Sequence, residues 1–267
     1  MREGNKLYGK SVLLTGATGG LGHAIARRLR AEGCTLTLTG RREDVLEPLA
    51  TEVGGRALIA DLSDPEEVGG VARECAEVDI LVANAGLPGT GPLEEYTTEQ
   101  IDRVLNVNLR SPIMLTRTIG ERMLARGDGH VVFISSLLGK LTIPITSLYH
   151  ATKFGLRGFA LALRSDWGPH GVRVSCACPG PIADAGMFHE GGGTMPIGFG
   201  TRSPEDVATA VTRALVRNKA EIDVVDSMTK AVAVFGLFAP QASSRLGKLF
   251  GAERVAQQLA EGQREKR

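Results

Sequence analysis

The chain has 267 residues, of which 43% are hydrophobic, 23% charged and 4% aromatic, and its formal net charge is +1. This length suits one large α/β domain. The near-neutral charge and the few aromatic residues argue against a nucleic-acid partner. No apolar run approaches the roughly 18 residues of a transmembrane span, and residues 1–10 lack the apolar stretch of a secretory signal. We therefore expect a cytoplasmic protein.

The chain contains four cysteines, Cys34, Cys75, Cys176 and Cys178. None of them forms a C-x-x-C pair, and the five histidines show no ligand spacing against them. Metal sites built from these residue types usually show such spacings. We predict reduced, buried thiols and no metal site.

Short runs rich in Val, Leu and Ile alternate with helical patterns along the whole chain. Strands are predicted at 12–15, 35–39, 56–60, 80–83, 130–135, 172–176 and 221–225. Helices are predicted at 20–32, 43–53 and 149–167, after the caps Asp64, Thr97 and Ser203, with Pro112 bending or restarting the one that follows Thr97.

Alternation of this kind produces βαβ units, and these build a parallel sheet covered by helices on both faces. We predict an α/β fold made of a single doubly wound Rossmann-type domain with a seven-stranded, mostly parallel sheet. The domain spans 1–267, with a core at about 8–226 and a helical C-terminal extension at 227–267.

A glycine-rich turn, Thr15-Gly16-Ala17-Thr18-Gly19-Gly20-Leu21-Gly22, follows the first predicted strand and leads into a helix. Without Cβ atoms the turn can be tight, and N–H groups at the helix N-terminus can meet a pyrophosphate. The alternative is a turn that only packs the helix closely on the strand. Its place in the first βα unit favours dinucleotide binding.

The glycine spacing, G-x-x-x-G-x-G, resembles that of the short-chain dehydrogenase/reductase family. Further motifs of that family follow in order, and the resemblance covers roughly residues 8 to 225. It implies an NAD(P)-dependent oxidoreductase whose cofactor contacts include Gly16, Thr18, Gly20, Leu21, Gly22, Asp61, Leu62, Asn84, Ala85, Gly86, Tyr149, Lys153, Pro179, Gly180 and Ile182.

The position that reads the cofactor's ribose follows the second strand, in Thr39-Gly40-Arg41-Arg42. NAD enzymes usually place a carboxylate there for the ribose 2′-OH, but here Gly40 occupies it. Arg41 is free to bind a 2′-phosphate through its planar fork. The alternative is a solvated basic turn. We expect NADP(H) rather than NAD(H).

Tyr149 and Lys153 form a Y-x-x-x-K pair near the start of a predicted helix, so both side chains lie on one helix face. A cation about 4 Å from the phenol oxygen stabilises the phenolate by roughly 4 kcal/mol. Such a cation lowers the pKa of the phenol from near 10 toward neutral pH. The spacing therefore predicts an acid/base tyrosine. Pairs at this spacing also occur by chance in helices.

Ser136 lies thirteen residues before Tyr149, and Asn108 lies twenty-eight residues before Ser136. These intervals match the Asn-Ser-Tyr-Lys tetrad of the family. By resemblance, Tyr149 exchanges a proton with the carbonyl oxygen and Ser136 orients that oxygen. Lys153 holds the nicotinamide ribose and lowers the tyrosine pKa, and Asn108 fixes a water. The simpler alternatives are a turn hydroxyl for Ser136 and a helix-surface amide for Asn108.

A glycine-rich stretch at 184–203 indicates a mobile lid rather than a packed element. Apolar side chains interleave with its glycines, and more follow Ser136. We take Leu138 and Met187, with Ser136 and Tyr149, as substrate contacts for an apolar ketone or secondary alcohol. Ordinary loop anchoring is the alternative. Asp184 replaces a threonine usual in the family, and either faces the nicotinamide or points to solvent.

Two other functions share these motifs: a non-catalytic cofactor-binding sensor, and a nucleotide-sugar epimerase or dehydratase. The intact tetrad disfavours the first, and the glycine spacing disfavours the second. Family members usually dimerise through helices corresponding to 112–126 and 149–167, so a homodimer or homotetramer is expected.

The C-terminal segment departs from the commoner family pattern. Residues 228–238 are almost wholly apolar, and Ala242, Leu246, Leu249 and Phe250 form a one-sided stripe. Val255 and Leu259 continue a weaker stripe. The segment is expected to cover the substrate mouth or to dock on a partner subunit. An extra core helix and a membrane-surface helix are the alternatives.

Overall fold

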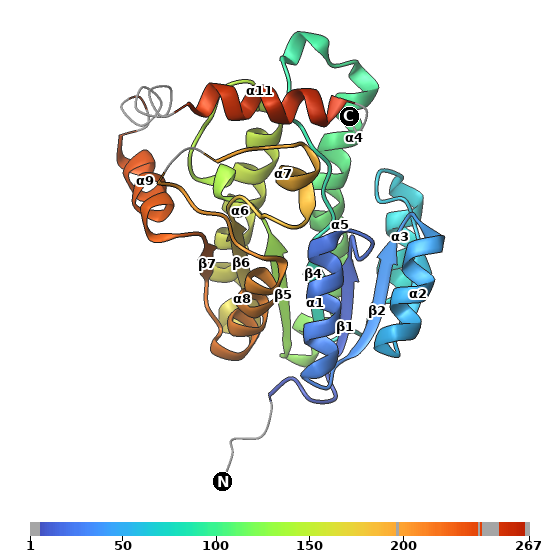
Figure 1. The fold of residues 1–267 in the computed structure, drawn as a ribbon. Helices are drawn as coiled ribbons and strands as arrows, with labels where there is room; N and C mark the ends of the chain where they lie inside the picture. Colours follow the sequence, from blue (N-terminus) through green and yellow to red (C-terminus); the bar gives the residue numbers. More distant parts are fainter. Residues whose placement is uncertain (1–5, 196–197, 240, 242–250, 265–267) are drawn as a thin grey trace.

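A computed structural model of the chain describes residues 6–195, 198–239, 241 and 251–264. The seven strands form one sheet in the order β3-β2-β1-β4-β5-β6-β7 (Figure 1). All six neighbouring pairs are parallel, which confirms the predicted architecture. The strands are β1 Ser11–Thr15, β2 Thr35–Gly40, β3 Arg56–Ile59, β4 Ile80–Ala83, β5 Gly129–Ile134, β6 Val172–Pro179 and β7 Glu221–Val224.

Helices cover both faces of this sheet (Figure 1). Their apolar sides form two clusters with the strands. One cluster contains side chains from α1 (Gly20–Ala31), α2 (Glu43–Val53) and α8 (Pro204–Arg217). The other contains side chains from α3 (Pro65–Glu74), α5 (Ser111–Arg126) and α6 (Ser147–Trp167). The strand order reverses between β1 and β4. Open α/β sheets bind ligands at such a reversal, outside the carboxyl ends of the strands.

The helix after the capping box at Thr97 is interrupted as predicted. It runs as α4 (Thr98–Leu105), widens into a π-helical turn at Asn106–Arg110, and continues as α5. Pro112 lies in the first turn of α5, directly after the π-helical turn, and has no N–H to donate to the turn before it. This interruption carries Asn108 toward the interior, where it is fully buried.

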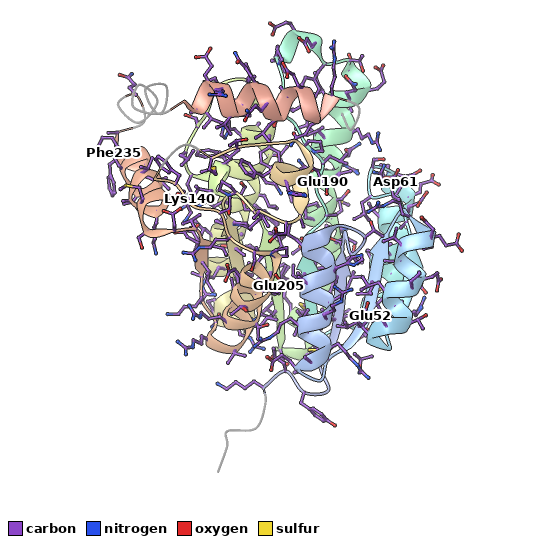
Figure 2. All side chains as sticks on the ribbon, in the orientation of Figure 1. Glu52, Asp61, Lys140, Glu190, Glu205 and Phe235 are labelled. Atoms are coloured by element: carbon purple, nitrogen blue, oxygen red, sulfur yellow. The ribbon has the colours of Figure 1, made fainter. Side chains whose placement is uncertain are left out.

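The C-terminal extension forms α9 (Ser227–Phe238) and α11 (Ala252–Gly262). On α9, Phe235 and Phe238 are exposed while Ala233 is buried, and Figure 2 shows Phe235 at the outside of the molecule. The predicted stripe from Ala242 to Phe250 lies outside the described residues. α11 crosses the carboxyl end of the sheet above the short α7 (Gly186–Glu190) (Figure 1). None of the described helices has the length and apolar character needed to cross a membrane.

The four cysteines are all free and buried, as the sequence predicts. Cys176 and Cys178 point to the same side of β6, with their sulfur atoms 3.9 Å apart. Burial raises the pKa of Cys34 to about 11, so this thiol stays protonated at neutral pH. A protonated, buried thiol is a poor nucleophile, and Cys34 packs as a small apolar residue.

Candidate active site

A cavity of about 1090 Å³ opens at the carboxyl end of the sheet. Every residue predicted from the sequence to contact the cofactor lines it, although these residues come from the carboxyl ends of five different strands and from α6. They are Gly16, Thr18, Gly20, Leu21, Gly22, Arg41, Asp61, Leu62, Asn84, Ala85, Gly86, Tyr149, Lys153, Pro179, Gly180 and Ile182.

The glycine turn needs its glycines because other backbone passes very close to it. Gly16 has a φ of +65°, and a Cβ there would lie 2.6 Å from Cα of Ala85. A Cβ on Gly20 would lie 2.3 Å from Cβ of Ala185, and one on Gly22 would lie 2.4 Å from the carbonyl oxygen of Gly16. Side chains at these positions would displace the turn from its neighbours. The turn thus presents bare backbone to the cavity, as binding of a pyrophosphate requires.

Asn84 holds this turn in place from the end of β4. Its amide nitrogen donates to the carbonyl oxygens of Thr15 and Gly16, each over 3.0 Å. The hydroxyl of Thr15 accepts hydrogen bonds from the backbone N–H groups of Asn84 and Ala85, also over 3.0 Å. The Asn-Ala-Gly stretch therefore fixes the position of the glycine turn as well as lining the cavity.

At the position expected to contact the ribose, the structure shows why residue 40 is a glycine and not an acidic residue. A Cβ on Gly40 would lie 2.8 Å from Cγ2 of Thr18 and 3.1 Å from its hydroxyl oxygen. Arg42, which the sequence did not single out, lines the cavity and donates to the carbonyl oxygen of Thr18 over 2.5 Å. The geometry accommodates two guanidinium groups at this rim and no acid at position 40.

Arg41 lies beside the acidic residue Asp61. Its guanidinium is 3.6 Å from the carboxylate of Asp61, and both side chains are partly exposed. Burial raises the pKa of the Asp61 carboxyl, but hydrogen bonds from Ser63 and the charge of Arg41 outweigh it and lower the pKa overall. Asp61 is therefore ionised at neutral pH. Figure 2 shows Asp61 at the end of the sheet that carries the cavity.

Tyr149 and Lys153 project from the first turns of α6 beside the end of β5. The ammonium of Lys153 lies 5.5 Å from the centroid of the Tyr149 ring and donates to the carbonyl oxygen of Ile134 over 3.1 Å. A side-chain hydrogen bond joins Ser136 to Tyr149. Ser136 also accepts from the N–H of Leu138 over 3.1 Å, which fixes its rotamer. Three of the four tetrad residues thus meet at one point.

The pKa values correct one expectation from the sequence. Burial raises the pKa of Tyr149 to about 12, and the hydrogen bond from Ser136 only partly offsets it. Burial also lowers the pKa of Lys153 to about 8. The lowering predicted from the sequence considered only the attraction between the phenolate and the Lys153 cation. In the folded chain, removal of both groups from water has the larger effect.

Asn108 holds the segment that follows the Asn-Ala-Gly stretch. Its carbonyl oxygen accepts from the N–H of Leu87 over 2.6 Å, and its amide donates to the carbonyl of Leu87 over 2.9 Å. A Cβ on Gly86 would lie 3.6 Å from both the Asn108 oxygen and the Lys153 ammonium. Asn108 therefore belongs to this site and is not a helix-surface amide.

Apolar side chains enclose the other half of the cavity. They come from the loop after Ser136, from the lid and from α11: Leu137, Leu138, Leu141, Ile143, Met187, Phe188, Met195, Phe199, Val255 and Leu259. Ile197 of the lid lies outside the described residues. The glycine-rich stretch that was predicted to be a lid contains a short helix, α7, that the sequence did not predict. Asp184 is exposed and is not among the described lining residues, so its carboxylate faces solvent.

Two further residues shape the site without having been predicted. His150 is buried, its Nδ1 lies 2.7 Å from the carbonyl oxygen of Leu138, and its Nε2 accepts from the N–H of Ile143 over 3.0 Å. These two contacts fix the loop that contains Leu138 and Ile143 against α6. A Cβ on Gly89 would lie 2.9 Å from the backbone nitrogen of Tyr149. In the sequence, His150 stands out only by its place inside the Y-x-x-x-K motif. Gly89 stands out only as a second glycine shortly after Gly86.

Comparison with known proteins agrees with this geometry. Residues 10–193 match the family described as short chain dehydrogenase. The chain is 32% identical to Ketoacyl reductase HetN of Nostoc sp. over 96% of its own length and 94% of that protein. It is also 32% identical to Dehydrogenase/reductase SDR family member 7B of Bos taurus, over 88% of this chain and 79% of that one.

Solved structures are similar as well. A putative betaketoacyl-ACP reductase is 30% identical with a TM-score of 0.74, over 82% of this chain and 97% of that chain. A short-chain dehydrogenase from Sphingobium yanoikuyae in complex with NADPH is 25% identical with a TM-score of 0.76, over 88% of this chain and 95% of that chain. With the family match, the sheet and the dinucleotide cavity together, the chain belongs to the short-chain dehydrogenase/reductase family and is an NAD(P)-dependent oxidoreductase.

Proposed function

We propose that this protein reduces a ketone carried on an apolar chain, with NADPH as the hydride donor. The observation that supports this most is one continuous cavity. It runs from the glycine turn, past Tyr149 and Lys153, to a pocket walled by Leu138, Leu141 and Met187. A ketone whose chain lies among these residues has its carbonyl next to the phenol.

The chain's own residues account for the proton and for orientation. Tyr149, kept protonated by burial, gives its proton to the carbonyl oxygen, and Ser136 orients that oxygen by a hydrogen bond. Lys153, charged below a pKa of about 8, would hold the ribose hydroxyls of the bound cofactor, and Asn108 would position a water that links Lys153 to solvent. The nicotinamide, when bound, supplies hydride transfer to the substrate carbon.

The preference for NADPH rests on the ribose rim. Thr18 leaves no room for a side chain at position 40, and Arg41 and Arg42 both line the cavity. The rim carries the guanidinium groups of Arg41 and Arg42 and the carboxylate of Asp61, so its net charge is positive. Because a 2′-phosphate is a dianion near neutral pH, this rim favours NADP(H) over NAD(H). The solved relative from Sphingobium yanoikuyae also binds NADPH.

For the substrate we propose a 3-oxoacyl ester or thioester. The apolar wall suits an acyl chain, and the Nostoc relative is named a ketoacyl reductase. The test is a panel of 3-oxoacyl thioesters, steroid ketones and small alicyclic ketones, each followed by NADPH oxidation and by identification of the alcohol. We expect 3-oxoacyl thioesters to give the highest kcat/KM. If no ketone is consumed while NADPH still binds, a non-catalytic cofactor sensor replaces this proposal.

We further propose a homodimer formed through α5 and α6. A shallow apolar hollow of about 260 Å³ lies between these helices, lined by Ile113, Leu124, Phe159, Leu163, Trp167 and their neighbours. Trp167 packs so closely on α5 that a Cβ on Gly120 would lie 2.1 Å from Cη2 of its ring. Such a surface suits the same surface of a second copy. Sedimentation equilibrium tests this, and a monomer at micromolar concentration contradicts it.

A further inference from the structure

His150 is a buried polar residue that the proposed proton transfer does not use. It follows Tyr149 on α6 and is 7% exposed. Its Nδ1 lies 2.7 Å from the carbonyl oxygen of Leu138, and the N–H of Ile143 donates to its Nε2 over 3.0 Å. Because a carbonyl oxygen can only accept, the ring hydrogen is on Nδ1, and Nε2 is left as the acceptor. Burial lowers the pKa of His150 and outweighs the backbone hydrogen bonds, so the imidazole is neutral.

The two partners of His150 stand at the ends of the pocket wall, the loop of residues 138–143. Leu138 and Ile143 end this loop, Leu141 lies between them, and all three line the cavity. Thr146, the residue before α6, makes a third contact with the pocket wall. Its buried hydroxyl donates to the carbonyl oxygen of Ile143 over 2.8 Å. The N–H and the carbonyl of Ile143 are thus both held by side chains at the start of α6.

The catalytic serine just before the pocket wall has attachments of its own. Ser136 accepts from the N–H of Leu138 over 3.1 Å. The hydroxyl of Ser135 donates to the carbonyl oxygen of Lys153 over 2.9 Å, which ties the end of β5 to α6. Neither of these contacts involves His150. Loss of the two imidazole hydrogen bonds would therefore release the pocket wall and leave the catalytic serine in place.

We propose that His150 is a positioning residue that determines substrate specificity, by holding the pocket wall where the chain of a long ketone packs against it. A wall that is fixed before binding spares such a ligand the free-energy cost of ordering it. A short ketone does not extend along the wall and gains nothing from its order. This inference rests on the proposed ketone reduction and goes beyond it, because it names a residue that selects substrates without touching them.

Methyl decyl ketone and methyl ethyl ketone test this selection, because they share the reacting group and differ only in chain length. His150→Phe keeps a ring in place and removes both hydrogen bonds of the imidazole. We expect KM for methyl decyl ketone to rise about three- to tenfold, the scale of a neutral hydrogen bond. Its kcat, and kcat/KM for methyl ethyl ketone, should stay near the parent values. His150→Gln, whose amide oxygen can replace Nε2 as acceptor, should recover part of the loss.

Two further variants separate the hydrogen bonds from the packing of the ring. Phe154 meets the His150 ring edge-on, with centroids 6.1 Å apart. Phe154→Leu is the matched control: it changes the packing of the imidazole, keeps both hydrogen bonds and should leave KM for both ketones unchanged. Thr146→Val removes the contact with the Ile143 carbonyl and should raise KM for methyl decyl ketone alone, as His150→Phe does.

Two results overturn the proposal: a His150→Phe variant that keeps the parent's KM for methyl decyl ketone, or one that loses activity on both ketones by the same factor. An equal loss would show that the side chain only supports the fold. Calorimetric titration of methyl decyl ketone into the protein with NADP⁺ measures the same difference as a Kd. Absence of turnover therefore counts against the proposed function, whereas equal Kd values for parent and His150→Phe count against this inference.

Discussion

Arg42 donates a hydrogen bond to the backbone carbonyl of Thr18 over 2.5 Å and so ties the loop after β2 to the glycine turn after β1. Thr18 in turn fills the space in which a side chain at position 40 would stand. Arg41, one residue earlier than Arg42, reaches instead toward Asp61. The two arginines therefore differ in their contacts: Arg42 supports the turn, whereas Arg41 pairs with Asp61 and is the residue on which the proposed preference for NADPH depends.

This difference predicts distinct results for two alanine variants. Arg41→Ala is expected to reduce the preference for NADPH over NADH by about 1.5–3 kcal/mol, the scale of a hydrogen bond to a charged group. Arg42→Ala is expected to weaken both cofactors, because the Thr18 carbonyl loses its partner. Fluorescence titration of each variant with both cofactors measures this. Equal affinity of the parent for NADPH and NADH would refute the assignment.

A buried ion cluster near the site predicts a pH-dependent effect on stability. Lys140, 6% exposed and labelled in Figure 2, lies 2.5 Å from the carboxylate of Glu221 and also pairs with Asp223. Lys140→Met removes the cation from two half-buried carboxylates, although Arg157 still pairs with Glu221, and we expect it to cost about 1–3 kcal/mol of unfolding free energy at neutral pH. Arg28→Met, which removes an exposed pair with Glu32, is the control and costs less than about 1 kcal/mol.

The sign of the pH effect follows from Glu221. Burial raises its pKa, but hydrogen bonds from Arg157 and Lys140 outweigh this and lower it below 4.5. Its ion pairs therefore stabilise the fold above the unfolded pKa, and this stabilisation is lost as the pH falls through the folded value. Urea unfolding should show the Lys140→Met deficit staying constant from pH 7 to about pH 5 and shrinking as the pH falls below about 4.5. A deficit that stays constant below about pH 4.5 contradicts the account.

The catalytic pKa values predict the pH profile of reduction. Lys153 is charged below a pKa of about 8 and neutral above it, while Tyr149 keeps its proton up to about 12. We expect kcat/KM for ketone reduction to be flat at neutral pH and to fall above about 8 as Lys153 loses its charge. Alcohol oxidation needs the deprotonated phenol, so its rate should rise with pH instead. If kcat/KM for reduction begins to fall well below pH 8, a group other than Lys153 determines the pH profile.

Much of the site follows from local sequence signals. The glycine turn and Tyr149 with Lys153 each occupy one short stretch, and parallel strands bring the ends of such stretches together. Those residues were predictable for that reason. The place of Gln263 in the cavity lining could not be predicted, because it depends on the contact between Gly191 and Gly262. Such a contact produces no periodic pattern in the sequence. The pKa of Tyr149 was mispredicted because spacing reports a nearby cation and says nothing about burial.

The central claim is that Tyr149 is the proton donor, and Tyr149→Phe tests it most directly. The variant keeps the ring and removes the transferable proton, and Tyr8→Phe makes the same change at an exposed tyrosine (80% exposed) as the control. We predict that kcat for the best ketone falls at least about 100-fold in Tyr149→Phe, while the Kd for NADPH and the activity of Tyr8→Phe stay near those of the parent. A Tyr149→Phe variant that reduces the ketone at close to the parent's rate would contradict the account.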